Sequence, residues 1–162
     1  MYWRQTWRAD RRAAAIADRH YSRQSHGTDQ FTPPGRVLVL VTPAYDALWC
    51  TSWPFAQYVT RAWKGAWVCS LFRNESPVLS SELITEAVAV TRWRWPQVPD
   101  DGMVTMIDRN KVRRKRDWGR CYRRAGFVPV GETQGGLLVL QLLPQDMPAA
   151  AAPYIYQAQL WS

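Results

Sequence analysis

The stretch Cys121-Tyr122-Arg123-Arg124-Ala125-Gly126-Phe127 decides the fold that the sequence predicts. Its first residues end a helix that we expect over Trp118–Ala125. Gly126 suits the left-handed position that commonly closes a helix, because glycine has no side chain to clash there. A strand, Phe127–Glu132, follows directly. A second apolar run, Leu137–Leu143, comes after a Gly-rich turn, so the two strands form a hairpin.

Earlier in the chain, runs of apolar residues and alternation of apolar with polar residues predict five more strands and two more helices. The expected strands are Met1–Ala9, Arg36–Thr42, Ala47–Trp53, Ala66–Arg73 and Met103–Asp108. Asp10 should cap a helix over Arg11–Arg19, and Ser81 should cap a longer helix that Pro96 to Gly102 stops. The segment 55–64 is ambiguous. We expect an α/β (α+β) domain over residues 1–143, with a central mixed, mainly antiparallel sheet and helices on both faces, and a tail over 144–162.

The composition favours a protein that meets a polyanion. The chain has 162 residues and a formal net charge of +8, and such a surplus attracts nucleic acid. The ten Trp residues leave several aromatic side chains for base stacking, Trp93, Trp95 and Trp118 among them. The three Cys residues form no CxxC pair, and we expect Cys50 and Cys69 to be core thiols. No signal peptide or membrane span is evident, so we expect a cytoplasmic protein without a membrane partner.

A dense run of cations lies between the strand that ends near Asp108 and the helix that ends at Gly126. Charge runs are usually solvated faces, but the position of this one beside a core strand favours contact with phosphates. Arg73 has two interpretations, an ion pair with Glu75 or a phosphate contact. The run comprises Arg109, Lys111, Arg113, Arg114, Lys115 and Arg116.

The order of the expected elements, together with Tyr122-Arg123-Arg124-Ala125-Gly126-Phe127, resembles the GNAT superfamily, whose fourth helix closes in the same way. One departure concerns the cofactor. GNAT acyltransferases hold the CoA pyrophosphate on a Gly-rich turn at a helix N-terminus, whereas residues 72–82 contain no glycine. Pro77 lacks an N–H, and Glu75 and Glu82 would repel a pyrophosphate. The sequence therefore disfavours acetyl-CoA, leaves the cofactor unidentified and leaves a metal open.

Scattered motifs resemble the Mom-like branch of that fold, phage enzymes that modify the exocyclic amine of DNA adenine and so evade restriction. The motifs are His20-Tyr21-Ser22, Ser70 to Glu75, Ser80-Ser81, and Asp108 with Lys111-Val112-Arg113. The resemblance implies a DNA-modifying transferase, acting in the host cytoplasm if the gene belongs to a phage. The extruded base would meet Tyr122, His20 with Tyr21, and Asp108 for proton transfer, while Ser80 or Ser81 steadies the donor.

Each candidate also has a structural interpretation. His20 suits contact with the last carbonyls of its helix, and Tyr122 suits packing of its helix on the sheet. Asp108 suits capping of the next turn, and the serines suit plain N-capping. Two other functions stay open: an N-acyltransferase that takes acetyl-CoA or another activated donor to a protein or small molecule, and a GNAT-fold module that binds nucleic acid without catalysis. A homodimer is compatible with all three functions.

Overall fold

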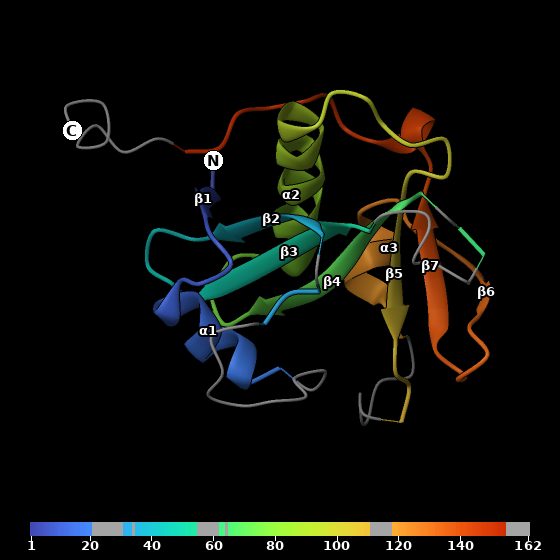
Figure 1. Ribbon diagram of the computed structural model, residues 1–162, viewed down its shortest axis with the longest axis horizontal. Helices are drawn as coiled ribbons and strands as arrows, with labels where there is room; N and C mark the ends of the chain where they lie inside the picture. Colours follow the sequence, from blue (N-terminus) through green and yellow to red (C-terminus); the bar gives the residue numbers. More distant parts are fainter. Residues whose placement is uncertain (21–30, 34, 55–61, 64, 111–117, 155–162) are drawn as a thin grey trace.

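Seven strands and three α-helices make up the described part of the chain, which the computed structural model gives as residues 1–20, 31–33, 35–54, 62–63, 65–110 and 118–154 (Figure 1). The strands are β1 (Arg4–Thr6), β2 (Arg36–Val41), β3 (Ala47–Trp53), β4 (Trp67–Asn74), β5 (Met103–Ile107), β6 (Val128–Glu132) and β7 (Leu138–Leu142). The helices are α1 (Arg11–Asp18), α2 (Ser80–Arg94) and α3 (Arg120–Arg124), and a 3-10 turn, η2, spans Pro144–Asp146. Strands and helices follow in the predicted order, with ends shifted by a few residues. The ambiguous segment 55–64 lies mostly outside the described residues.

The strands form one sheet in the order β1-β2-β3-β4-β5-β7-β6. Only β4 and β5 pair in parallel, and every other neighbouring pair is antiparallel. The predicted α+β class with a mixed, mainly antiparallel sheet is therefore confirmed. The last hairpin is also confirmed, and β7 rather than β6 lies against β5.

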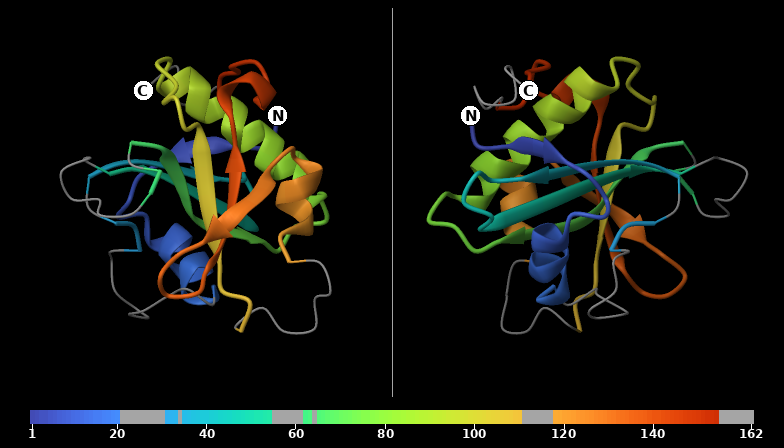
Figure 2. Two further views of the ribbon diagram at one scale, coloured as in Figure 1. Left: turned by 90° about the vertical axis from the view of Figure 1, so that its right-hand side faces the viewer. Right: turned by 60° about the vertical axis from the view of Figure 1, so that its left-hand side comes forward.

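Two apolar clusters lie on opposite sides of β2 and β3. Helix α1 packs through Ile16 with Val39 and Leu48, whereas α2 packs through Leu83 with residues that include Leu38 and Trp49. Successive side chains of a strand point to opposite faces, so these neighbouring strand residues face different helices. Figure 2 shows the same arrangement, with α1 below β2 and β3 and α2 above them in the right-hand view.

Strand β4 contains an extra residue, Ser70. The pairing of β3 with β4 shifts from Cys50↔Leu71 to Thr51↔Cys69, which leaves Ser70 without a partner residue on β3. A bulge of this kind reverses the faces of the residues that follow it. Accordingly, Cys69 belongs to the cluster under α2 and Leu71 to the cluster under α1.

Local chemistry accounts for most helix ends. Asp10 caps α1 as predicted, because its side chain accepts from the backbone N–H groups of Arg12 and Ala13. The expected start of α3 at Trp118 is wrong. Gly119 has φ 76°, a left-handed conformation that delays the helix until Arg120. Gly126, with φ 99°, ends it as predicted.

The described part of the expected tail, up to Tyr154, packs against the domain. Met147 is buried in the main core. Ala151 N donates to the Ala89 carbonyl of α2 at 3.1 Å, and Tyr154 N donates to the Trp3 carbonyl at 2.7 Å. Residues 144–154 therefore cover α2 and the chain just before β1. In the described residues, no helix has the length and apolar character that a membrane span requires.

Candidate functional site

Strands β4 and β5 begin side by side and then diverge. They pair at Trp67↔Met103, Val68↔Val104 and Cys69↔Thr105. Thr105 Oγ1 donates to the Cys69 carbonyl at 3.2 Å, which is the last link between the strands before the bulge at Ser70. Figure 1 shows β4 running to the left, toward α1, and β5 running downward on the right-hand side of the view. The sheet thus opens where Cys69 and Thr105 end the parallel pairing.

Tyr122 of α3 lies at this opening. Its hydroxyl is 3.6 Å from the Cys69 sulfur. Its ring makes edge contacts with Phe72 of β4, at 6.2 Å between centroids, and with Phe127, at 5.4 Å. These contacts hold both the ring and the hydroxyl against the splayed strand. The structure therefore shows a packing role for Tyr122, and it also places the phenol hydroxyl beside Cys69, where the parallel pairing of β4 and β5 ends.

The acid–base state of this pair follows from its surroundings. Burial raises the pKa of Tyr122 well above its ordinary value, and the neighbouring Cys69 and Cys121 raise it further. Burial also raises the pKa of the Cys69 thiol to about 12, although hydrogen bonds with Tyr122 and Thr105 oppose that rise. At neutral pH Tyr122 is consequently a neutral proton donor, and Cys69 is a thiol rather than a nucleophilic thiolate.

His20 lies just beyond α1, beside the far half of β4. Its backbone N–H donates to the Ala17 carbonyl at 2.9 Å, so it closes the last turn of α1. Burial lowers its pKa to about 4, and the charge of Arg73 acts in the same direction, whereas a hydrogen bond with the Phe72 backbone opposes the shift. The imidazole is therefore neutral at pH 7 and able to accept a proton. Tyr21 lies outside the described residues.

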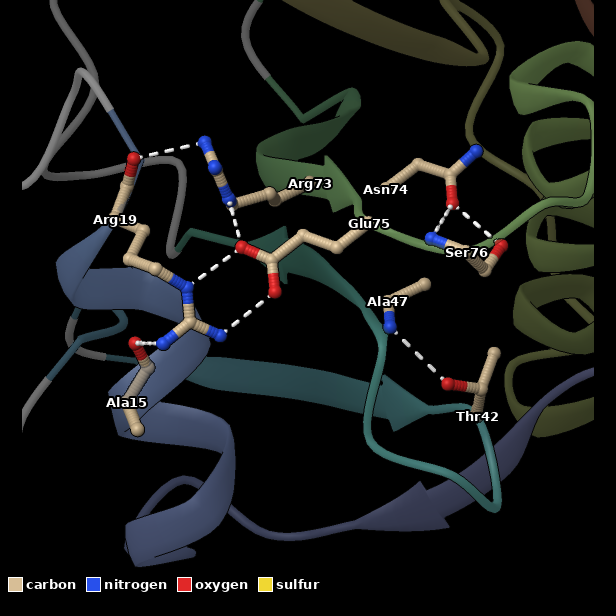
Figure 3. Close-up of polar contacts among 8 residues, drawn as sticks. All are labelled: Ala15, Arg19, Thr42, Ala47, Arg73, Asn74, Glu75 and Ser76. Carbon is tan, nitrogen blue, oxygen red and sulfur yellow. Dashed lines mark hydrogen bonds and ion pairs between the residues drawn. The ribbon is translucent and has the colours of Figure 1, made fainter.

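An ion-pair cluster holds the end of α1 against the end of β4 (Figure 3). Arg19 donates to both carboxylate oxygens of Glu75, from Nε at 2.6 Å and from Nη2 at 2.7 Å. Arg73 Nε donates to the same carboxylate at 2.6 Å, and Arg73 Nη1 donates to the Arg19 carbonyl at 2.8 Å. Hydrogen bonds from Arg19 and then Arg73 lower the pKa of Glu75 to about 2. We call Arg19, Glu75 and Arg73 the α1–β4 clamp. Of the two interpretations of Arg73, the structure shows the ion pair.

The loop from β4 to α2 uses its own backbone donors. Ser76 N donates to Asn74 Oδ1 at 2.9 Å, and Val78 N donates to Ser76 Oγ at 3.2 Å. Glu75 N donates to the Asp46 carbonyl at 2.7 Å, and Pro77 has no N–H. Four consecutive residues therefore offer no available amide to an anion.

The serines at the start of α2 have different surroundings. Leu79 is the N-cap residue, and it makes no side-chain capping bond, so the expected N-cap at Ser81 is wrong. Ser80 Oγ instead accepts from Asn74 Nδ2 at 3.0 Å. Ser81 lines a shallow cavity beside Glu82, Glu86 and Arg124. The cavity thus carries two carboxylates and one guanidinium group.

Asp108 follows β5 and caps a turn. Its Oδ1 accepts from Asn110 N at 3.0 Å. This contact is the turn capping that the sequence analysis gave as the alternative to a catalytic role for Asp108. None of its described contacts reaches Tyr122 or His20. Arg109 pairs with Glu132 of β6, while the other cations of the basic run, Lys111 and Arg113 to Arg116, lie outside the described residues.

Of the predicted stacking residues, only Trp93 is largely exposed, at 43%. Trp95 is buried and packs with Trp53 and Trp67. Trp118 is partly buried, and its Nε1 has no hydrogen-bond partner among the described residues. Trp95 is therefore a core residue and not an available stacking surface.

The structure thus brings His20 and Tyr122 to the same strand segment of β4, on either side of Phe72. No local pattern of residues indicates that Cys69 contacts Tyr122. Thr105 did carry a signal, because a lone hydroxyl within an apolar strand usually marks an internal hydrogen bond. No cluster of His, Cys, Asp and Glu suited to a metal ion is present within the described residues.

Comparison with known proteins identifies no relative of this chain. No protein-family profile matches the chain, and no curated protein or solved structure is significantly similar to it.

Proposed function

We propose that this protein is a GNAT-fold group transferase that modifies an exocyclic base amine in DNA, most like the Mom-like enzymes, for which that amine is adenine N6. The observation that carries the proposal is the Tyr122 hydroxyl, a neutral phenol at the point where β4 and β5 part. The strand order, the single parallel pair and the helix close at Gly126 support the GNAT resemblance.

The chemistry needs proton transfers in two directions. The attacking amine nitrogen loses a proton as it bonds to the incoming group, and the departing part of the donor gains one. In this proposal the neutral His20 accepts the first proton and Tyr122 supplies the second. Both are neutral at pH 7, and the same burial that lowers the pKa of His20 and raises that of Tyr122 makes His20 a weaker base and Tyr122 a weaker acid until the substrate is bound.

The donor in this proposal carries no pyrophosphate on the β4–α2 loop. The amides of Glu75, Ser76 and Val78 are already occupied, and residue 77 is proline. The Glu82 and Glu86 carboxylates at the nearby cavity add repulsion. These features favour an activated donor other than acyl-CoA, which separates the proposal from an acetyltransferase.

The acceptor is inferred from charge and from the Mom resemblance. A net charge of +8 favours a polyanion. An exocyclic amine inside a duplex is out of reach of a side chain at the sheet opening, so the base must leave the stack.

The deciding experiment is a mass measurement on nucleosides. Bacteria express the unaltered protein, a Tyr122→Phe variant or a Tyr154→Phe variant at equal levels. Their DNA is isolated and digested to nucleosides, which are then weighed by mass spectrometry. We expect one new, heavier nucleoside with the unaltered protein and with Tyr154→Phe, and almost none with Tyr122→Phe. DNA without any new nucleoside would refute the proposal, and acetylated protein in the same cells would favour the acyltransferase.

A further inference from the structure

An exposed Trp and three exposed Arg lie close together in sequence where β1 leads into α1. Trp7 is 64% exposed, and Arg8, Arg11 and Arg12 are exposed as well. The backbone turns within this segment, since Asp10 N donates to the Trp7 carbonyl at 3.1 Å. We call Trp7, Arg8, Arg11 and Arg12 the Trp7 corner. None of its residues belongs to the site at the sheet opening.

The one acid within the corner does not offset its charge at the surface. Asp10 is buried, and its carboxylate accepts from Thr6 Oγ1 at 2.6 Å and from Tyr45 Oη at 2.8 Å. It also accepts the backbone N–H groups of Arg12 and Ala13. The carboxylate is thus turned inward and fully used by the fold, while the three guanidinium groups stay outside.

The arginines of the corner differ from Arg73 and Arg109, the described members of the set of cations that the sequence analysis assigned to DNA. Arg73 and Arg109 are paired with Glu75 and Glu132. In the described part of the chain, no carboxylate forms an ion pair with Arg8, Arg11 or Arg12. The Arg12 guanidinium lies over the Tyr45 ring, 3.8 Å from its centroid, and Arg8 donates to the Gly35 carbonyl. These contacts hold Arg8 and Arg12 in place without bringing a carboxylate of the described residues to them.

The combination of groups indicates the kind of partner. An exposed indole offers a large, rigid ring face on which another ring can stack. Proteins that bind single-stranded nucleic acid pair aromatic rings, which stack on bases, with cations that follow the backbone. The other residues of the corner are arginines, and cations suit a polyanion better than an apolar protein surface. The chemistry of the corner therefore matches bases and phosphates.

We propose that the Trp7 corner is a binding site for single-stranded DNA, in which Trp7 stacks on an unpaired base and Arg8 and Arg11 contact flanking phosphates. The inference rests on the proposed function only in taking DNA as the polyanion. It deepens that function, because a base extruded for modification leaves unstacked nucleotides for an exposed indole to hold.

The test measures binding without catalysis. Fluorescence anisotropy with a labelled single-stranded oligonucleotide, and with the duplex of the same sequence, is recorded over a series of salt concentrations. We expect Trp7→Ala to weaken single-strand binding by about 5- to 150-fold, the usual range for one stacked base, with an unchanged salt slope. Trp7→Phe should retain most of the affinity. Arg8→Gln/Arg11→Gln should reduce the salt slope by about 1.4, for two phosphates on a single strand.

A control uses two exposed residues outside the corner, Arg94 at the end of α2 and Val128 of β6. We expect Arg94→Gln/Val128→Ala to leave binding unchanged. Equal losses in the control and the Trp7 variants, or no loss in the Trp7 variants with circular dichroism unchanged, would overturn the inference. The two proposals fail separately. A modified nucleoside without Trp7-dependent binding removes only this inference, and Trp7-dependent binding without a modified nucleoside removes only the proposed function.

Discussion

At the scale of single residues, the Tyr122 hydroxyl is held by a sulfur rather than by an oxygen or nitrogen. The Cys69 thiol is a weak hydrogen-bond partner, so the fold gains little from this contact. Nearly all the packing of Tyr122 comes from its ring, through Phe72 and Phe127. Chemistry and stability are therefore separable at this position.

Tyr122→Phe should remove activity and leave the fold intact. The substitution keeps the ring and deletes only the proton donor, so we expect the modification rate to fall by about 10²- to 10⁴-fold, the usual size of a general-acid contribution. The thermal midpoint should change little. Rates from nucleoside analysis and melting curves of both proteins test this expectation, which an unchanged rate would refute.

His20 should make stability depend on pH in a defined window. Its pKa is about 4 in the folded protein and about 6.5 when unfolded. The unfolded state therefore binds the extra proton first, and stability falls as the pH drops from about 6.5 toward 4. His20→Gln lacks this titration. Urea unfolding at several pH values should show the unaltered protein losing stability relative to the variant.

The range between pH 6.5 and 4.5 isolates His20. Glu75 has its ordinary pKa near 4.5 and a folded pKa of about 2, so its contribution to stability is lost only at lower pH. Parallel stability curves for the two proteins between pH 6.5 and 4.5 would contradict the lowered pKa of His20.

At the scale of elements, the α1–β4 clamp places His20. The clamp joins the residue before His20 to the residue after Phe72 through one carboxylate. Arg19 and Arg73 are substantially exposed, at 47% and 35% of their side chains, so solvent screens the attraction. The position of the clamp therefore matters more than its contribution to stability.

Glu75→Gln should lower activity more than stability. We expect a loss of about 1 kcal/mol or less in the free energy of unfolding, as for other exposed ion pairs. The modification rate should fall further, because the end of α1 and the neighbouring His20 are no longer fixed against β4. Urea unfolding and rate measurements on one preparation test this expectation. An unchanged rate would show that His20 is placed by other contacts.

The sequence predicted these elements well where local chemistry acts alone. The Asp10 cap and the Gly126 helix end depend on neighbouring residues, and both were found. The cap at Ser81 was wrong because Asn74, six residues before Ser80, reaches forward to hold the Val78 carbonyl and Ser80 Oγ. A contact made through a folded loop leaves no periodic trace in the sequence.

At the scale of the whole molecule, the candidate site also depends on contacts between distant residues, which local sequence patterns do not reveal. The α+β class followed from the order of apolar segments, whereas the approach of His20 and Tyr122 to Phe72 depends on the strand order and on the bulge in β4. Neither is visible in local patterns. Asp108 was predicted for its place after a strand, but that place alone does not distinguish a capping carboxylate from a catalytic one.

Acetyl-CoA should not bind at micromolar concentrations. The β4–α2 loop offers no available amide from Glu75 to Val78, and two carboxylates line the cavity beside Ser81. Calorimetry should show no heat of binding, and the melting temperature should stay constant, since a ligand that binds the folded state would raise it. A micromolar dissociation constant would instead favour the acyltransferase.

The unpaired Ser70 has a consequence for how this gene can vary. Substitutions at position 70 change one hydroxyl, which contacts Ser52 Oγ and the Cys50 carbonyl. Loss of the codon would instead close the bulge, because Cys69 and Leu71 would follow each other opposite Thr51 and Cys50, and Leu71 to Arg73 would keep the faces that they have now. A library of single-codon deletions should therefore retain functional clones that lack residue 70, as it retains clones that lack a residue of the turn at 134–136. Loss of every active clone without residue 70 would show that the local bend of the bulge is itself required.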